Sequence, residues 1–344
     1  MAQPFDAGRM EITGEPTAMA QEVSIQPAPN FLNFSVSQTG LLVYSSGTVD
    51  TGRQLVWYDR QGKLLSRLGS PEYSSWPQIS PDGQRLAIRL LTQPAGSFDI
   101  WVYDLSRGVR TRMSFSALTA FAANAWSPNG KQLAYSHSSQ QDPGDHMYLL
   151  NPDGTGKEEA LEEPIIESLG NYPSSWSPDG QVLLFDHQDK AGKFSIWALP
   201  LGGDRKPYTF VESHFNSQMG RFSPDGHWVA YVSRDSGIEE VYVAPFPGPG
   251  GRIQVSGGGG SQPRWRGNGQ ELFYLSPELK MMAAQLTTTN GDLRVGSVQA
   301  LFTVGALGGY DVTADGQKFI VAQDSEQTST FLTLVTNWSA ELKK

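Results

Sequence analysis

Histidines at matching positions are the first residues whose types and spacing suggest chemistry in this sequence. Five histidines are present, and His137 and His187 each end an apolar run, LAYSH and LLFDH, so both are expected at equivalent strand ends. A catalytic zinc ion needs a third protein ligand and an open coordination position. No HExxH motif or carboxylate at ligand spacing accompanies this pair. The simpler interpretation is that both side chains form hydrogen bonds, and no metal site is predicted.

Other catalytic signatures are also incomplete. The sequence contains no Gly-x-Ser-x-Gly nucleophile elbow. The stretch DPGDHMYLLNPDGTGKEE holds Asp142, Asp145, Asp153 and Glu158, but it lacks the residue order of an EF-hand loop. The glycine-rich stretch SGGGGSQ (256–262) is not followed by Lys-Ser or Lys-Thr, as a phosphate-binding loop would be. We therefore predict a protein that is not an enzyme and that uses no cofactor.

A repeated motif indicates which elements position the remaining polar and aromatic residues. WSPDGQVLLFD (176–186) has close relatives in ISPDGQRLAI (79–88), WSPNGKQLAY (126–135) and FSPDGHWVAY (222–231), and weaker ones in VSQTGLLVY (36–44), WRGNGQELFY (265–274) and VTADGQKFIV (312–321). The seven glycines of these motifs are 43 to 50 residues apart and are Gly40, Gly83, Gly130, Gly180, Gly226, Gly269 and Gly316. A period of about 45 residues is typical of one four-stranded blade of a β-propeller.

The local chemistry of the repeat favours short antiparallel strands. Ser-Pro-Asp-Gly forms a type I turn in which Pro presets φ and Gly takes a positive φ, and the apolar runs on both sides indicate buried strands. A third strand follows at a regular offset, as in DIWVYDL (99–105) and EVYVAPF (240–246), and a weaker fourth strand carries charge and Thr. The sequence therefore predicts an all-β, seven-bladed β-propeller of four-stranded antiparallel blades with few helices. A six-bladed ring is the alternative, because VSQTGLLVY is a degenerate repeat.

One domain is expected over residues 1–344. Residues 1–30 would close the ring, residues 31–338 would form the repeat units, and residues 339–344 would be a tail. No Pro/Ser-rich linker interrupts the repeats.

The closure of the ring is expected to involve the N-terminal segment, because the seventh repeat is one strand short after FLTLVTNW (331–338). An open blade would leave an edge strand exposed to aggregation. We therefore expect AMAQEVSI (18–25) to be the outermost strand of blade seven, paired antiparallel with residues 331–337. Residues 1–13 would then be a leftover third strand of a blade that lies upstream in a longer parent protein.

Aromatic and amide side chains gather near the first strand of each blade, where they would meet at one mouth of the central channel. Such side chains can bind a peptide or a partner loop. They can also simply close the channel, and both interpretations stay open. The predicted ligand-binding residues are Tyr73, Trp76, Phe121, Asn124, Tyr172, His214, Asn216, Gln218, Gln262, Arg264 and Tyr310.

Composition excludes several classes of function. The formal net charge is −9 and no Lys/Arg cluster occurs, so nucleic-acid binding is not expected. The absence of cysteine excludes disulfides and thiolate metal sites and leaves the compartment undefined. The sequence has no apolar run long enough for a membrane span and no signal-peptide core. A content of 37 Gly and 22 Pro suits a protein of many short strands and turns.

At SPDGQRLAI and DIWVYDL the sequence resembles the PD40, or WD40-like, repeats of TolB-type propellers. It is still more similar to the repeats in the C-terminal part of bacterial membrane serine/threonine kinases, notably of Acidobacteria, in RQLVWYDRQGK, FSPDGHWVAYVS, EVYVAPFPGPGG and GSQPRWRGNGQELFYLSP. The resemblance covers essentially the whole sequence and implies a periplasmic or other extracytoplasmic sensor or interaction module. Kinase activity is not implied, because the sequence has no Gly-rich kinase loop, HRD or DFG motif.

Two functions follow from these observations. The favoured one is a monomeric, non-catalytic propeller that binds a protein, peptide or envelope ligand at the channel mouth. The alternative is a lyase or hydrolase that works inside the channel, which requires convergent acid and base groups at the mouth. For that chemistry the sequence offers Arg221, Arg264, Asp311 and His214.

Overall fold

Two compact units make up the protein in this computed structural model. Residues 52–324 form one unit, and residues 1–51 together with 325–344 form the other. The structure describes residues 2–17, 25–27, 30–32, 34–37, 39, 41–46, 52–92, 97–115, 124–138, 144–161, 168–211, 214–248, 250–305, 307–325 and 331–336. Every regular element in these ranges is a β-strand, which confirms the all-β class.

Six antiparallel sheets of four strands account for the regular structure described in residues 52–324. Five of them use consecutive strands. The first two contain β9 (Ser74–Ile79), β10 (Arg85–Thr92), β11 (Ser97–Asp104) and β12 (Val109–Arg112), and then β13 (Asn124–Trp126), β14 (Leu133–His137), β15 (His146–Leu150) and β16 (Glu159–Ala160). The next contains β17 (Ser168–Trp176), β18 (Val182–Asp189), β19 (Phe194–Pro200) and β20 (Tyr208–Val211).

The remaining sheets complete the set. The last two consecutive ones contain β21 (Ser217–Phe222), β22 (Trp228–Ser233), β23 (Glu240–Pro245) and β24 (Ile253–Gln254), and then β25 (Ser261–Trp265), β26 (Glu271–Leu275), β27 (Lys280–Thr289) and β28 (Asp292–Thr303). The sixth, called the closing sheet, has the order β29 (Leu307–Val312), β30 (Lys318–Asp324), β7 (Arg53–Asp59) and β8 (Leu64–Glu72).

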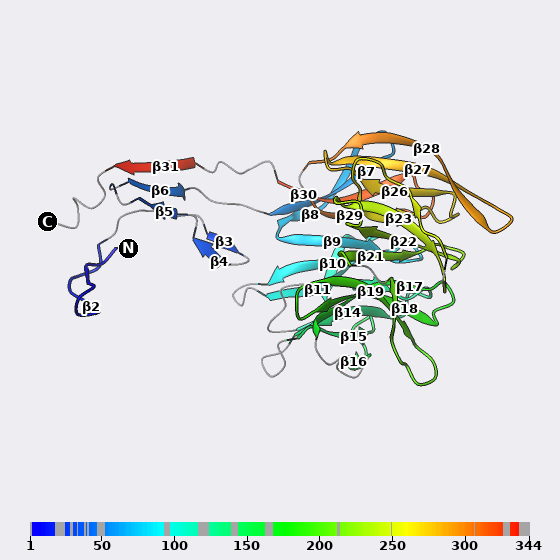
Figure 1. The fold of residues 1–344 in the computed structure, drawn as a ribbon, viewed down its shortest axis with the longest axis horizontal. Coiled ribbons are helices and arrows are strands. Elements are labelled where there is room, and N and C mark those ends of the chain that lie inside the picture. The colour runs from blue at the N-terminus through cyan, green and yellow to red at the C-terminus, as the bar shows by residue number, and fades with distance from the viewer. Residues whose placement is uncertain are drawn as a thin grey trace. The chain divides into compact units, whose positions relative to one another are not determined.

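The six sheets are joined into a ring through their first strands. β9, β13, β17, β21, β25 and β29 contact one another in this order, and β29 also contacts β9. Figure 1 follows the sheets from cyan β9–β11 through green to orange β27 and β28. The blue strands β7 and β8 lie with β29 and β30, because β30 pairs with β7 from Lys318 opposite Asp59 to Asp324 opposite Arg53. Residues 52–324 therefore form a closed β-propeller whose innermost strands surround a channel.

The Ser-Pro-Asp-Gly turn connects the first and second strands of a sheet as its chemistry predicts. Between β17 and β18, the N–H of Gly180 donates to the carbonyl of Ser177 (2.8 Å). Asp179 accepts hydrogen bonds from the Ser177 hydroxyl (2.5 Å) and from the N–H of Gln181 (3.0 Å). Gly180 has a φ of +72°, which is costly for residues that carry a Cβ. Gly40, in the weakest repeat, lies outside the described residues.

The hydrophobic core lies between neighbouring sheets. In one cluster Val241 and Val243 of β23 pack with Leu272 and Ala284 of the next sheet, and all four are fully buried. The tryptophans before the turns also connect sheets. The indole N–H groups of Trp126, Trp176 and Trp265 donate to the carbonyls of Gln78 (3.0 Å), Ala125 (3.1 Å) and Arg221 (3.0 Å), each in the preceding sheet.

The number of blades corrects the first expectation from the sequence. The described residues form six four-stranded sheets where seven were expected, so the six-bladed alternative applies. The reason is that the first and last repeats share one sheet. β30 is the second strand of the last repeat, and it pairs with β7, the third strand of the first repeat. This pairing satisfies two strand edges that an open arc of blades would leave bare.

Three small sheets are described in residues 1–51 and 325–344. β1 (Phe5–Asp6) pairs with β2 (Glu11–Ile12), and β3 (Ile25–Pro27) pairs with β4 (Asn30–Leu32). β31 (Phe331–Thr336), β6 (Leu41–Ser46) and β5 (Phe34–Val36) form a three-stranded sheet in this order. The single domain expected over residues 1–344 is thus divided into two compact units.

The expected closure through residues 18–25 is wrong for the part that the structure describes. β31 pairs with β6, from Phe331 opposite Ser46 to Thr336 opposite Leu41. Ile25 pairs with Leu32, and residues 18–24 lie outside the described residues. β31 has the apolar composition of a third strand, and it pairs with β6, which is the second strand of the first repeat.

Candidate functional site

The innermost strands break their regular pairing as they line the channel. β9, β17, β21, β25 and β29 each show a shift in register against the neighbouring strand. Near these shifts Trp76, Met219 and Gln262 have φ values of +53°, +62° and +55°, and Gly309 has +110°. All four stand four residues before the first residue of the turn. A bulge of this kind redirects side chains, and the strain of about 1–3 kcal/mol for each non-glycine residue is typical of functional sites.

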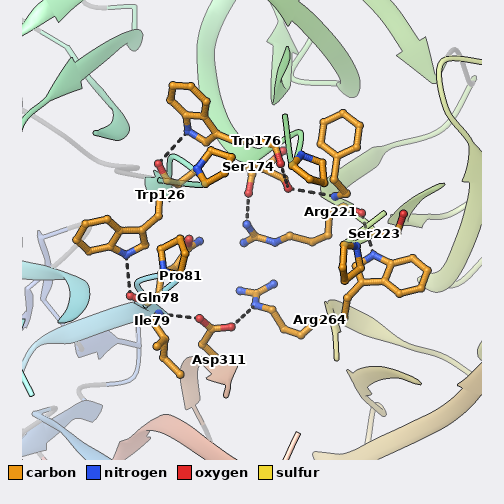
Figure 2. A pocket seen from close by; sticks show the side chains of 17 residues that line it. Gln78, Ile79, Pro81, Trp126, Ser174, Trp176, Arg221, Ser223, Arg264 and Asp311 are labelled. Atoms are coloured by element: carbon orange, nitrogen blue, oxygen red, sulfur yellow. Dashed lines mark hydrogen bonds and ion pairs between the residues drawn. The ribbon is translucent and has the colours of Figure 1, made fainter. Parts of the chain in front are cut away.

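Six side chains, one from each sheet, form a ring around the channel, and we call them the channel ring. They stand two residues before the first residue of the turn and are Gln78, Ala125, Ser175, Arg221, Arg264 and Asp311. They line a cavity of about 320 Å³. A second set, the apolar collar, lines the same cavity and consists of Pro81, Pro128, Pro178, Pro224, Trp126, Trp176 and Trp265. Figure 2 shows the guanidinium groups of Arg221 and Arg264 reaching toward the middle of this ring.

Asp311 holds Arg264 in place within the ring. Its Oδ1 lies 3.2 Å from Nε of Arg264, and its Oδ2 accepts a hydrogen bond from the N–H of Ile79 at 2.7 Å. Nη1 of Arg264 donates to the carbonyl of Pro263 (2.9 Å). The Arg264 side chain is only 7% exposed, and its Nη2 is buried without a hydrogen-bond partner in the described ranges.

Arg221 is the second cation of the channel ring. Its Nη1 donates to the carbonyl of Ser174, and its Nε is buried with no described residue as a hydrogen-bond partner. Burial and the neighbouring charge of Arg264 lower the pKa of Arg221 to about 9. Arg221 is therefore a cation at neutral pH, and each of the two arginines has a buried N–H group that no described residue accepts.

A second cavity of about 320 Å³ continues along the channel. Gln78, Ser174 and Arg221 line both cavities. The second one also contains Arg89 of β10 and Asp186 of β18. Since the residues that line it come from four different sheets, the site exists only when the ring is assembled.

The channel carries more positive than negative charge, although the protein as a whole is acidic. Three arginines, Arg89, Arg221 and Arg264, face two carboxylates, Asp186 and Asp311, in the two cavities. Burial lowers the pKa of Arg89 to about 10, assisted by the charge of Arg53. Desolvation raises the pKa of Asp186 to about 6 against the opposing effects of the Met219 N–H and Arg221. The channel therefore favours an anionic ligand.

Five of the predicted ligand-binding residues line the two cavities. Trp76, Asn124, Tyr172 and Gln218 line the second cavity, and Arg264 lines the first. Nδ2 of Asn124 donates to the carbonyl of Trp76 across the boundary between two sheets (3.5 Å). The ligand that these residues would bind stays a prediction.

Two further predicted residues support the channel from behind. Tyr310 is fully buried, and its hydroxyl donates to the carbonyl of Gln262 (2.9 Å). The guanidinium carbon of Arg264 lies 5.6 Å from the centre of the Tyr310 ring. Tyr310 and Gln262 therefore hold the strand that carries Arg264.

The other predicted residues do not line either cavity. Tyr73 packs against Phe98, with ring centres 6.0 Å apart, and Asn216 accepts a hydrogen bond from the N–H of Phe194 (3.1 Å). His214 is exposed, and Phe121 lies outside the described residues. Tyr73, His214 and Asn216 precede the innermost strands rather than belonging to them, which explains their distance from the channel.

The sequence carried a signal for part of what the prediction missed. Alignment of the repeats places Gln78, Ser175 and Arg221 in the same column as Arg264, two residues before the turn. Arg221 and Asp311 were considered only for the catalytic alternative. Arg89 and Asp186 had no such signal, because they lie in second strands, within LAIRL and LLFDH.

The two histidines occupy equivalent positions in their repeats, but only His137 ends its strand. His187 lies within β18, and the two side chains form separate contacts. Nε2 of His137 lies 3.5 Å from Oε1 of Glu158, and its ring stacks on Tyr148 at 4.1 Å. Nδ1 of His187 is hydrogen-bonded to Oδ1 of Asn171 (2.8 Å). Within the described ranges, no group of three or more His, Asp or Glu side chains is arranged to hold a metal ion.

A closed ring of four-stranded sheets around a channel defines a β-propeller, and comparison with known proteins gives its family. The TolB beta propeller domain matches residues 53–300, so the chain belongs to the TolB beta-propeller family. This confirms the TolB-type resemblance of the repeats.

Solved structures show the same fold. A protein described as putative TolB from Agrobacterium tumefaciens is 16% identical, with a TM-score of 0.63, over 80% of this protein and 98% of its own length. TolB from Acinetobacter baumannii is 16% identical with a TM-score of 0.54, over 86% of this protein and 79% of its own length. An oligogalacturonate lyase in complex with manganese is 14% identical with a TM-score of 0.55, over 84% of both proteins.

No helix in the described part of the protein has the length and apolar character needed to cross a membrane.

Proposed function

We propose that this protein is a non-catalytic binding propeller that receives a segment of a partner protein or peptide at the mouth of its channel. The observation that carries the proposal is the cavity of about 320 Å³ between the channel ring and the apolar collar. Tryptophan and arginine side chains in a desolvated pocket are frequent anchors of protein interfaces. Proline adds apolar surface without losing side-chain freedom on binding.

The lining of the channel also supports binding rather than catalysis. Among the described residues that line the two cavities there is no histidine or lysine, so Ser174, Ser175 and Ser223 have no such base beside them in that lining. Nucleophilic catalysis by serine requires an adjacent base. The repeats also resemble those of kinase-associated propellers. From this resemblance we propose that the module lies outside the cytoplasm and that its ligand is a protein, a peptide or another envelope component.

Selection from a phage-displayed random peptide library against the immobilised full-length protein tests this function. Peptides that reach the second cavity are expected to lose up to about 2 kcal/mol of binding free energy with Trp76→Ala. Tyr208→Ala is the control, because Tyr208 is an exposed aromatic residue on the outer strand β20. Failure to enrich any peptide, or equal affinity for the Trp76→Ala and parent proteins, would contradict binding at this channel.

A channel lyase or hydrolase is a second candidate, and Asp186 is the observation that favours it. A carboxyl group with a pKa of about 6 next to Arg221 is suited to accept a proton near neutral pH. Turnover of oligogalacturonate or of a peptide by the full-length protein, lost in Asp186→Asn and kept in Asp153→Asn, would support this candidate. Asp153 is the control because it is exposed in a turn outside both cavities.

A further inference from the structure

We propose that Arg221 and Arg264 together bind a carboxylate group on the segment that enters the channel. The carboxylate would belong to an acidic side chain or to the C-terminus of a polypeptide. This inference rests on the proposed binding function and specifies the chemistry of its ligand.

The unsatisfied N–H groups of the two arginines are the main observation. Nη2 of Arg264 and Nε of Arg221 are both buried, and neither has a hydrogen-bond partner among the residues that the structure describes. Buried donors on charged groups are costly when unpaired. A guanidinium group presents its N–H donors in a plane that matches the two oxygens of a carboxylate. An incoming carboxylate would therefore satisfy donors that the fold leaves open.

Asp311 does not fill this role, because both of its oxygens are already engaged. Oδ1 contacts Nε of Arg264, and Oδ2 accepts from the N–H of Ile79 in the neighbouring sheet. Asp311 thus fixes the orientation of Arg264 from one side and leaves Nη2 available (Figure 2). It is a positioning residue for the site.

The charges of the channel point to a ligand with a single negative charge. Arg89, Arg221 and Arg264 exceed Asp186 and Asp311 by one charge when both carboxyl groups are ionised. The effect of Arg264 on the pKa of Arg221 shows that the two cations repel each other. One carboxylate between them would remove this repulsion and neutralise the excess, whereas a doubly charged phosphate would reverse it.

The apolar collar indicates what surrounds the carboxylate. Four prolines and three tryptophans line the cavity that contains the two arginines. Apolar groups of the ligand can pack against these residues while its carboxylate reaches the ring. An acidic residue flanked by apolar residues, or an apolar C-terminal segment, fits this arrangement.

Nuclear magnetic resonance of the arginine Nε–H groups in the full-length protein tests the site directly. The probes are N-acetylglycine for a terminal carboxylate, N-acetylaspartate α-amide for an aspartate carboxylate, N-acetylasparagine amide as the neutral analogue, and sodium sulfate. We expect saturable shifts of the Arg221 and Arg264 signals with a carboxylate and none with the neutral analogue. The carboxylate that binds more tightly identifies the source.

Variants that keep the positive charge separate recognition from folding. Arg221→Lys and Arg264→Lys retain a cation but lose the planar fork, and each is expected to weaken carboxylate binding by about tenfold or more. Arg107→Lys, on an exposed turn, is the matched control and should bind like the parent. The absence of saturable shifts with either carboxylate, equal shifts with the neutral analogue, or tighter binding of sulfate than of both carboxylates would overturn the proposal.

The two proposals fail in different ways. Selected peptides that bind at the channel, carry no carboxylate and tolerate Arg221→Lys would overturn the carboxylate site and leave the binding function intact. Carboxylate binding without any peptide selected would support the arginine site and contradict the peptide-binding function.

Discussion

The closing sheet and the sheet β21–β24 are both four-stranded and antiparallel but join segments at very different separations in the sequence. β22 and β23 follow each other in sequence and pair from Trp228 to Ser233, with every residue of β22 buried. β30 and β7 join residues 318–324 to residues 53–59. The closing pair adds two polar contacts between its strands, Arg53 Nε with Asp324 Oδ1 (2.9 Å) and the Tyr58 hydroxyl with Gln323 Oε1 (2.6 Å).

This comparison shows that strand composition does not determine which copy of a repeat a strand pairs with. The last repeat pairs its second strand, β30, with β7 of the first repeat. The first repeat pairs its second strand, β6, with β31 of the last repeat. Third strands of the two repeats are therefore exchanged, while the order of first, second and third strands is kept. The free-energy cost of closing the long loop grows only slowly with its length, so distant strands can form an ordinary ladder.

A disulfide across the closing ladder gives the largest expected effect. Arg53→Cys with Asp324→Cys links two paired residues of β7 and β30 in a protein that has no other cysteine. In the loop-entropy model, oxidation should raise the free energy of unfolding by about 5 kcal/mol. Thr287→Cys with Arg294→Cys closes only the hairpin of β27 and β28 and should give about 2 kcal/mol. Denaturant unfolding with and without reductant measures both, and equal gains would mean that the closing ladder does not limit unfolding.

Glycine substitutions in the turns compare the closing sheet with an ordinary sheet. Gly316 and Gly180 have φ values of +69° and +72°. A Cβ at Gly316 would lie 3.1 Å from Cζ of Phe273, whereas at Gly180 the nearest atom is Cδ of Pro128 at 3.9 Å. Gly180→Val should therefore cost about 1–2 kcal/mol through backbone strain alone. Gly316→Val should cost about 3 kcal/mol or more, because crowding is added.

Thermal and denaturant unfolding of the two glycine variants tests this difference. An unchanged melting curve for Gly180→Val would show that the turn does not require the left-handed conformation. Equal losses at the two glycines would show that contact with Phe273 is not important for the closing sheet.

Removal of the smaller unit is expected to have little effect on the propeller. Both strands of the closing ladder lie within residues 52–324. A protein of residues 52–324 should therefore have the same association state as the parent and unfold cooperatively within a few degrees of it. Size-exclusion chromatography and calorimetry measure this. Association of the truncated protein, or a large drop in melting temperature, would show that residues 1–51 or 325–344 contribute to closure.

The smallest effect concerns His137 and His187, which occupy equivalent positions in two ordinary sheets. Burial alone would lower the pKa of His137, but Glu158, the carbonyl of Ser138 and the charge of Asp145 together outweigh burial and raise it. His137 therefore contributes stability below its unfolded-state pKa and loses it as the pH rises through the raised folded-state value. Burial lowers the pKa of His187, so its contribution is present at higher pH and is lost as the pH falls.

The variants His137→Gln and His187→Gln test these opposite signs. Between about pH 5 and pH 8, where histidine titrates, the parent protein should lose the stabilising contribution of His137 as the pH rises. The His137→Gln variant should not show this loss. The parent should lose the contribution of His187 as the pH falls, and the His187→Gln variant should not show that loss. Changes of the same sign in the two variants would contradict the opposite pKa shifts of the two histidines.

Part of the candidate site could be predicted from sequence because the repeats bring it into register. Arg264 and four residues of the second cavity were predicted from their position near the first strand of each blade. The strand DIWVYDL, expected at 99–105, is β11, which spans Ser97–Asp104. Arg89 and Asp186 could not be recognised, because a polar residue in a buried second strand has no periodic signal that distinguishes the channel from the core. Their role depends on four sheets meeting at one axis.

The sequence by itself determined the turns, the strand types and the all-β class, because these depend on residues within about ten positions of each other. Proline and glycine fix the turn geometry locally, and the apolar runs on both sides of the turns define the strands. Only the tertiary structure decided the number of sheets, the pairing of β30 with β7 and of β31 with β6, and the meeting of Arg221, Arg264 and Asp311. The physical reason is that all repeats carry chemically equivalent strand edges, so the partner of each edge is selected by the geometry that closes the ring.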